Sequence, residues 1–202
     1  MEILLKLAEK IENKELRKKV IEYVNDKKLK NPHFSKYKRE DLEKAGSYFS
    51  VGNSHFGPIE RDVVHHTAVL THMVIQIAKI VESGYGIKID MDSLIAASIC
   101  HDIMKSVEYN RDENNELEPT GVSLDHTMLG VAELYAREFP EDVIHIVASH
   151  AGEAGTTKPK SFEALIFHEL DSLASVIEYY AIVYSKLKEK MKAFEKEKED
   201  NE

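Results

Sequence analysis

The sequence predicts an all-α fold of roughly seven or more helices. Apolar residues recur at spacings of three and four along most of the chain, which is the period of amphipathic helices. The alternating pattern of half-buried strands is nearly absent. The chain has 202 residues and 43% hydrophobic content, which is enough for one domain with a real core.

The N-terminal region is expected to be helical and then irregular. Residues 2–28 predict two short helices, or one helix broken near Asn13. A further short helix is expected over residues 38–45, and a loop over 47–58, where turn-forming residues are frequent. We expect residues 1–58 to pack as N-terminal helices on the core that follows.

A long central helix is expected from about residue 59 to 83. Pro58 precedes it, and proline suits the first turn of a helix. Apolar residues cover most of its circumference, which indicates burial; its main stripe is Val63, Thr67, Leu70, Val74, Ile77 and Val81. Residues 90–93 offer N-caps for the next helix, which carries the apolar run Leu94–Ile99.

The second half begins with a polar loop, expected over residues 107–123. Helices are then expected at about 125–138 and 141–150. The last helix begins near Ser161, and its apolar stripe is Ile166, Leu170, Leu173, Ile177, Tyr180, Tyr184, Leu187 and Met191. We expect a core domain over 59–185 and a charged helix end or tail over 186–202.

Composition argues against several classes of function. The net charge of −9 argues against binding of long nucleic acid, which requires a basic surface. The sequence has no apolar run long enough for a membrane helix, and its first residues lack the features of a signal peptide. Cys100 is the single cysteine, so no intramolecular disulfide forms and we expect a reducing, cytoplasmic location.

Six potential metal ligands lie among apolar residues, on expected helices or at their ends. Imidazoles mixed with carboxylates suit divalent transition metals. Each residue taken singly has an ordinary structural explanation, so the inference depends on the whole set. Six ligands favour two ions that share one carboxylate. The candidates are His72, His101, Asp102, His126, His150 and Asp171.

In order and spacing, these motifs resemble the HD superfamily of metal-dependent phosphohydrolases, which is named for an adjacent His-Asp pair. LTHMVIQIAKIV resembles its first motif, AASICHDIMK the pair and LDHTMLGVAEL the third motif. IVASHAGEAG and KPKSFEALIFHELDSLAS resemble the last two. The nearest subgroup is the HD domain of bacterial 3′–5′ exoribonucleases, without its OB domain. The resemblance covers roughly residues 60–178.

The resemblance implies an HD-domain helical bundle that holds two divalent ions. Asp102 would bridge them. His72, His101 and Asp171 would complete the first site, and His126 and His150 the second. Mn, Fe, Ni, Co, Zn and Mg all remain open as the metal.

The implied reaction is hydrolysis of a phosphate ester or anhydride in a nucleotide or related small phosphoester. A water activated by both ions would be the nucleophile. Asp102 and Lys105 are then the catalytic candidates, and Lys105 and His65 the candidate substrate contacts. His66 points away from His72 and is expected to be structural. Asp125 is expected to cap the helix that His126 begins.

The chain departs from the family pattern at two positions, and two alternative functions stay open. Met104 replaces a common glycine, and Ala151 replaces a second histidine of the exoribonuclease subgroup. A non-catalytic nucleotide-sensing module, or a di-iron oxygenase, would use the same scaffold. The stripe of the last helix fits a homodimer contact as well as burial within the domain.

Overall fold

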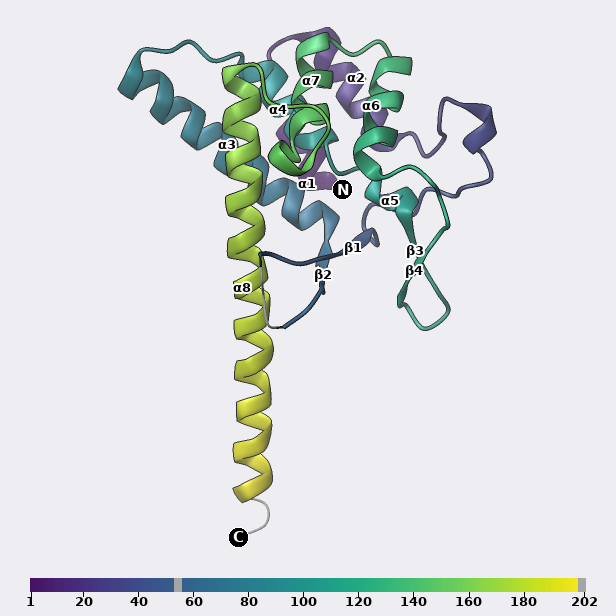
Figure 1. Cartoon of the computed structure of the whole chain (residues 1–202), viewed down its shortest axis with the longest axis vertical. Coiled ribbons are helices and arrows are strands. Elements are labelled where there is room, and N and C mark those ends of the chain that lie inside the picture. Colours follow the sequence, from purple (N-terminus) through teal and green to yellow (C-terminus); the bar gives the residue numbers. More distant parts are fainter. Residues whose placement is uncertain (53–55, 200–202) are drawn as a thin grey trace.

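The computed structural model describes residues 1–52 and 56–199, and it confirms the all-α fold (Figure 1). Eight α-helices and two small antiparallel sheets lie within these residues. The helices are α1 (Glu2–Ala8), α2 (Lys14–Asn25), α3 (Val63–Tyr85), α4 (Met91–Cys100), α5 (Lys105–Glu108), α6 (His126–Ala136), α7 (Glu141–Ser149) and α8 (Phe162–Glu199). The strands are β1 (Gly46–Phe49), β2 (Ile59–Asp62), β3 (Tyr109–Arg111) and β4 (Leu117–Pro119).

Helix α4 is the centre of the bundle. Every residue from Ser93 to Cys100 is buried, as expected for a helix that is apolar on all sides. It packs on α1, α2, α3, α7 and α8. Asp90 caps its start by accepting the Ser93 N–H at 3.1 Å. Its other end delivers the His101–Asp102 pair into the interior, where both residues are buried.

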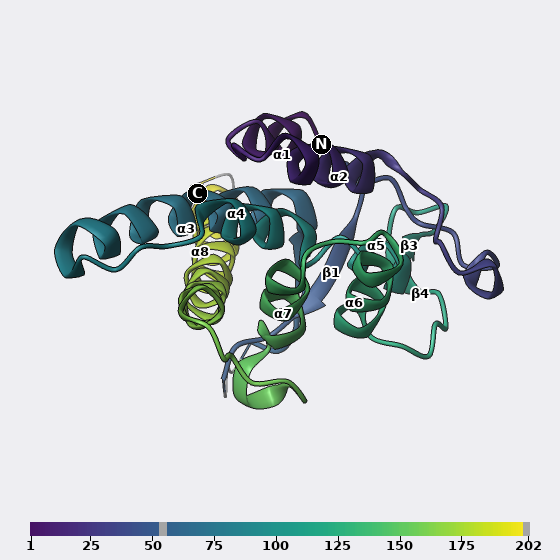
Figure 2. The same cartoon turned by 90° about the horizontal axis from the view of Figure 1, so that it is seen from above.

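Helix α8 is much longer than the bundle it joins. Its N-terminal part packs against α3 and α7, and seen from above it lies between them (Figure 2). Its C-terminal part extends beyond the other elements (Figure 1). With 38 residues, the helix is about 57 Å long.

The N-terminal region forms two helices, which decides between the two expectations for residues 2–28. The Asn13 side chain accepts the N–H groups of Glu15 and Leu16 at 3.0 and 3.1 Å. An asparagine in this role satisfies two donors at the start of a helix. Asn13 is therefore the N-cap of a separate helix, α2.

Residues 38–62 differ from expectation. The backbone over 38–45 forms turns and no helix, and the Glu40 N–H donates to the distant Ser106 carbonyl at 2.7 Å. The expected loop over 47–58 overlaps β1, which pairs antiparallel with β2 from Gly46↔Asp62 to Phe49↔Ile59. This pairing uses residues 59–62, so the central helix begins at Val63, with Asp62 as its N-cap.

The segment 107–123 was expected to be a polar loop, but it contains the hairpin β3–β4. Asp112 accepts the N–H groups of Asn114 and Glu116 at 2.9 and 2.7 Å. Asn115 adopts a left-handed conformation with φ of 66°, which asparagine tolerates better than most residues. The turn at residues 112–116 therefore brings together two short strands, although their sequences show no clear alternation of polar and apolar residues.

The last helix begins at Phe162, close to the expected Ser161, and remains helical to Glu199. The expectation for residues 200–202 lies outside the described part of the chain. Among the described helices, none combines the length and hydropathy that a bilayer-spanning segment needs.

Candidate metal centre

Two groups of potential ligands meet at Asp102. His66, His101 and Asp102 form one group, and Asp102, His126 and His150 form the other. Within each group the potential ligand atoms all lie within 4.8 Å of one another. Asp102 is common to both, which is the arrangement expected of a bridging carboxylate.

Helix termini bring these side chains together. His66 lies in the first turn of α3, and His101 and Asp102 follow directly after α4. His126 is the first residue of α6, and His150 is the C-cap of α7. The five residues come from four helices, so the bundle must form before the cluster exists.

The two oxygens of Asp102 face different histidines. Oδ2 lies 3.3 Å from His101 Nε2 and 4.0 Å from His66 Nε2. Oδ1 lies 3.4 Å from Nε2 of His126. Lys105 Nζ donates to Oδ2 at 2.7 Å. The Asp102 carboxylate thus directs one oxygen toward each of the two histidine groups.

Backbone carbonyls set the tautomer of two of the histidines. Nδ1 of His101 lies 2.8 Å from the Ser98 carbonyl, and Nδ1 of His150 lies 2.7 Å from the Val147 carbonyl. A carbonyl oxygen only accepts, so Nδ1 carries the proton in each ring. Nε2 of each neutral ring then has a free lone pair directed into the cluster. This is the usual form of a metal-binding histidine.

The residues present fit divalent cations. His101 Nε2 and Asp102 Oδ1 are buried and have no hydrogen-bond partner among the described residues. Buried polar atoms without partners are rare and costly in folded proteins. A cation coordinated by these atoms would satisfy both of them, and the mixture of imidazole and carboxylate ligands suits a transition metal.

His66 is held between two carboxylates of α8. Its Nε2 lies 3.0 Å from Asp171 Oδ1, and its Nδ1 lies 3.1 Å from Glu178 Oε2. Glu178 in turn pairs with the buried Arg61 at 2.9 Å. The ring orientation of His66 is therefore determined by a network that joins β2, α3 and α8.

The surroundings of Asp102, Asp171 and His150 favour their deprotonated forms, which are the forms that bind metal ions. Burial tends to raise the pKa of Asp102, but the neighbouring His101 ring and the Lys105 ammonium outweigh it and hold that pKa well below its usual range. Burial also tends to raise the pKa of Asp171, but the His66 hydrogen bond and nearby imidazoles lower it. Burial lowers the pKa of His150 to about 4, so this imidazole is neutral at pH 7.

His66 shows the opposite shift. Its burial tends to lower its pKa, but hydrogen bonds with Asp171 and Glu178 raise it above the usual value. Both carboxylates therefore favour positive charge at this position. A cation that binds at Nε2 would take the place of the proton on that nitrogen.

The structure corrects the choice of His72 as the first ligand. The His72 side chain is exposed, whereas His66 is buried and lies in the cluster. A signal for this was present in the sequence. His66 is three residues after Val63 and four before Leu70, on the buried stripe, whereas His72 shares its face with Gln76 and Lys79.

The other predicted residues lie at or beside the cluster. Lys105 contacts Asp102, and Asp171 contacts His66. His65 is exposed and lines a groove beside His66, so its role as a substrate contact remains a prediction. Asp125 caps α6 by accepting the Met128 N–H at 2.9 Å, as expected.

Sequence reasoning missed two further carboxylates. Glu108 accepts the His126 backbone N–H at 2.6 Å and lies 3.3 Å from its Nδ1. Glu178 contacts Nδ1 of His66 through its side chain. Neither stands out in the sequence, because both are acidic residues among many in the chain. Their roles depend on which elements pack together.

Comparison with known proteins decides the family. Residues 69–176 match the HD domain family, and this range is more than half of the chain. The chain belongs to the HD domain family. The match lies inside the expected core of 59–185, and His66 lies just before it.

A curated relative of this HD protein is the dihydroneopterin 2′,3′-cyclic phosphate phosphodiesterase of Methanocaldococcus jannaschii. The two are 38% identical over 183 residues, which cover 90% of this chain and 72% of the relative. No solved structure matches the chain. The prediction of an HD-type, metal-dependent phosphohydrolase is confirmed. The relative is not an exoribonuclease, so the finer resemblance to that subgroup is not supported.

Proposed function

We propose that this HD phosphohydrolase opens the cyclic phosphodiester of a small 2′,3′-cyclic phosphate, with dihydroneopterin 2′,3′-cyclic phosphate as the first candidate substrate. The curated relative carries that activity in its name and aligns with 90% of the chain. The observation that carries the proposal is the position of Asp102 between two histidine groups. Such a centre fits hydrolysis at phosphorus.

The ligand assignment we propose uses two ions. His66, His101, Asp102 and Asp171 would hold the first, and Asp102, His126 and His150 the second. Divalent cations held in this manner lower the pKa of bound water and neutralise charge that develops on phosphoryl oxygens. The mixed ligand set does not select one metal among Mn, Fe, Co, Ni and Zn.

The chain's own residues would position the substrate and direct protons. The Lys105 ammonium is mostly buried and lies 2.7 Å from Asp102, where it can contact an anionic phosphate oxygen. Water adds to phosphorus and one ring P–O bond breaks. The departing oxygen takes a proton and becomes the free hydroxyl of a phosphate monoester, so atoms and charge balance.

The test is a comparison of substrates on metal-loaded protein. The protein is stripped with chelator and reloaded separately with Mn²⁺, Fe²⁺, Co²⁺, Ni²⁺ or Zn²⁺. It is then assayed with dihydroneopterin 2′,3′-cyclic phosphate, 2′,3′-cyclic nucleotides, 3′,5′-cyclic nucleotides and simple monoesters. Bound metal is counted by mass spectrometry. Asp102→Asn is the inactive variant, and Asp112→Asn, in the β3–β4 turn, is the matched control.

We expect about two metals per chain and preferential opening of 2′,3′-cyclic phosphates. We expect both metal binding and turnover to fall at least about 100-fold in Asp102→Asn, with little change in Asp112→Asn. Bound metal without opening of any 2′,3′-cyclic phosphate would overturn the substrate assignment. A stoichiometry of one, unchanged on removal of His126 or His150, would overturn the two-ion assignment.

A further inference from the structure

The outer part of α8 carries an exposed apolar stripe. Its members have exposed fractions between 45% and 69%, and several are large aromatic or aliphatic side chains. The stripe runs from the body of the domain into the part of α8 that extends beyond the other elements (Figure 1). Its members are Leu173, Ile177, Tyr180, Tyr184, Leu187 and Met191.

This stripe is distinct from the face that α8 uses within its own domain. Ala174 and Leu170 are buried in the main core. Tyr179 and Val183 are buried in a smaller cluster with Ile59 of β2. The helix therefore has two apolar faces, of which its own domain covers one. An uncovered apolar face of this length usually marks a binding surface.

The spacing of the exposed stripe is that of a coiled coil. Successive members are separated by four, three, four, three and four residues, which places them at alternating a and d positions of a heptad. Ile177, Tyr184 and Met191 occupy position a, and Leu173, Tyr180 and Leu187 occupy position d. A two-stranded coiled coil buries this narrow seam.

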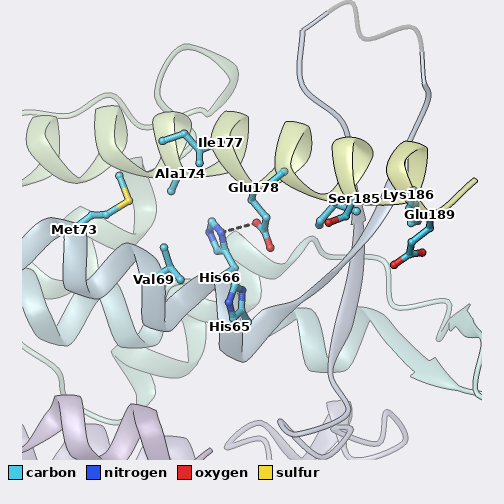
Figure 3. A pocket seen from close by; sticks show the side chains of 12 residues that line it. His65, His66, Val69, Met73, Ala174, Ile177, Glu178, Ser185, Lys186 and Glu189 are labelled. Carbon is cyan, nitrogen blue, oxygen red and sulfur yellow. Dashed lines mark hydrogen bonds and ion pairs between the residues drawn. The ribbon is translucent and has the colours of Figure 1, made fainter. Parts of the chain in front are cut away.

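A groove between α3 and α8 continues this surface toward the domain (Figure 3). Its volume is about 540 Å³, and its lining includes Val69 and Met73 of α3 and Ile177 of the seam. Val69 is itself 42% exposed. The apolar surface is thus broadest where the seam meets the domain.

We propose that a second copy of this chain covers the seam, with the two α8 helices parallel and in register. Charge complementarity favours this occupant and orientation. Lys190 is at position g and Glu195 at the following position e, and both are exposed. In a parallel pair, position g of one helix faces the next position e of the other. Each Lys190 then faces Glu195 of the other chain, twice by symmetry.

Oligomeric state and its dependence on the seam test the proposal. The mass of the full-length protein is measured by analytical ultracentrifugation from about 1 to 100 μM. We expect a dimer in this range, and at least about 100-fold weaker association for Leu187→Asp, because burial of a charge in the seam is costly. Lys192→Asp, at an exposed position outside the seam, should stay dimeric. Circular dichroism confirms that both variants remain helical.

Two outcomes would overturn the proposal. One is a monomeric wild-type protein at 100 μM, which would leave the seam to a different partner or to solvent. The other is a dimer that Leu187→Asp leaves unchanged, which would place the interface elsewhere. Neither outcome bears on the metal centre, because none of the altered residues contacts it.

Orientation has a separate test. Leu187→Cys at position d should form an interchain disulfide in a parallel pair, whereas the control Lys192→Cys should not. Native Cys100 is buried and does not interfere. Charge reversal in Lys190→Glu or Glu195→Lys should weaken association, and the double variant should restore it. A Leu187→Cys protein that fails to crosslink, together with no rescue in the double variant, would overturn the parallel arrangement.

Discussion

His66 Nε2 lies 3.0 Å from Asp171 Oδ1, although the two residues are 105 positions apart in the chain. The contact joins the first turn of α3 to α8. It places His66, rather than His72, beside the His101–Asp102 pair. Separate substitution of the two histidines therefore tests which of them supports the metal centre.

We expect His66→Ala to lower metal affinity and phosphohydrolase activity at least about 100-fold, because it removes a potential ligand atom from the buried cluster. His72→Ala should leave both within about twofold, since the His72 side chain is exposed. Metal titration by calorimetry and steady-state kinetics measure the two effects. Loss of metal in His72→Ala with retention in His66→Ala would contradict our assignment.

Glu178 orients His66 from the side opposite Asp171. We expect Glu178→Gln to weaken metal binding about 10- to 100-fold, because the amide is a poorer partner for the Nδ1 proton than the carboxylate. The substitution also unpairs the buried Arg61, so thermal unfolding of the metal-free protein is measured in parallel. Glu189→Gln, further along α8 and also beside the groove, is the control. Unchanged metal affinity in Glu178→Gln would show that this contact does not support the centre.

Gly152 allows the chain to turn tightly beside the site. Its φ is +51°, and a Cβ there would lie 2.0 Å from the His168 ring. That ring contacts the carbonyl of His150 through Nδ1 at 2.8 Å. We expect Gly152→Ala to lower the free energy of unfolding by about 1–3 kcal/mol through backbone strain and this clash.

Gly84 gives the matched control for that measurement. It lies in α3, and a Cβ there meets nothing within 4 Å. Gly84→Ala should raise the free energy of unfolding by up to about 1 kcal/mol, since alanine favours the helix. Urea denaturation measures both variants. Equal effects of the two substitutions would contradict the role assigned to Gly152.

Asp26 links the stability of the N-terminal helices to pH. Slight burial tends to raise its pKa, but the Lys28 N–H and the Arg137 side chain lower it below its usual value. The folded state therefore binds this proton more weakly than the unfolded state. The resulting stabilisation is present above about pH 4, the ordinary pKa of aspartate, and is lost as the pH falls through the lowered folded-state pKa.

Asp26→Asn should accordingly be less stable than the wild type at pH 7, by up to about 1 kcal/mol for a partly exposed ion pair. The difference should shrink steadily as the pH falls below about 4. Urea unfolding of both proteins at several pH values measures it. A difference that stays constant down to low pH would rule out the carboxylate as its source.

Local rules in the sequence predicted much of the helical framework. Periodic apolar residues and capping side chains such as Asn13, Asp90 and Asp125 locate the helices to within a few residues, because helical periodicity and capping act over short stretches of chain. Motif order indicated five of the six ligands that we propose. The two small sheets were not foreseen, since pairings such as Gly46↔Asp62 depend on contacts between separate segments.

The choice between His66 and His72 needed the tertiary structure. His66 falls on the apolar stripe of α3 and His72 does not, but only the packing of α3 against α4 and α8 brings the His66 ring beside His101 and Asp102. The same holds for Glu108 and Glu178, which lie beside His126 and His66 through packing between separate helices, 18 and 112 positions apart in the chain. The residue pattern indicated the family, the helical class and the types of candidate ligand. The packing decided which side chains meet, because the candidate ligands lie on separate helices and local sequence patterns do not show which helices come together.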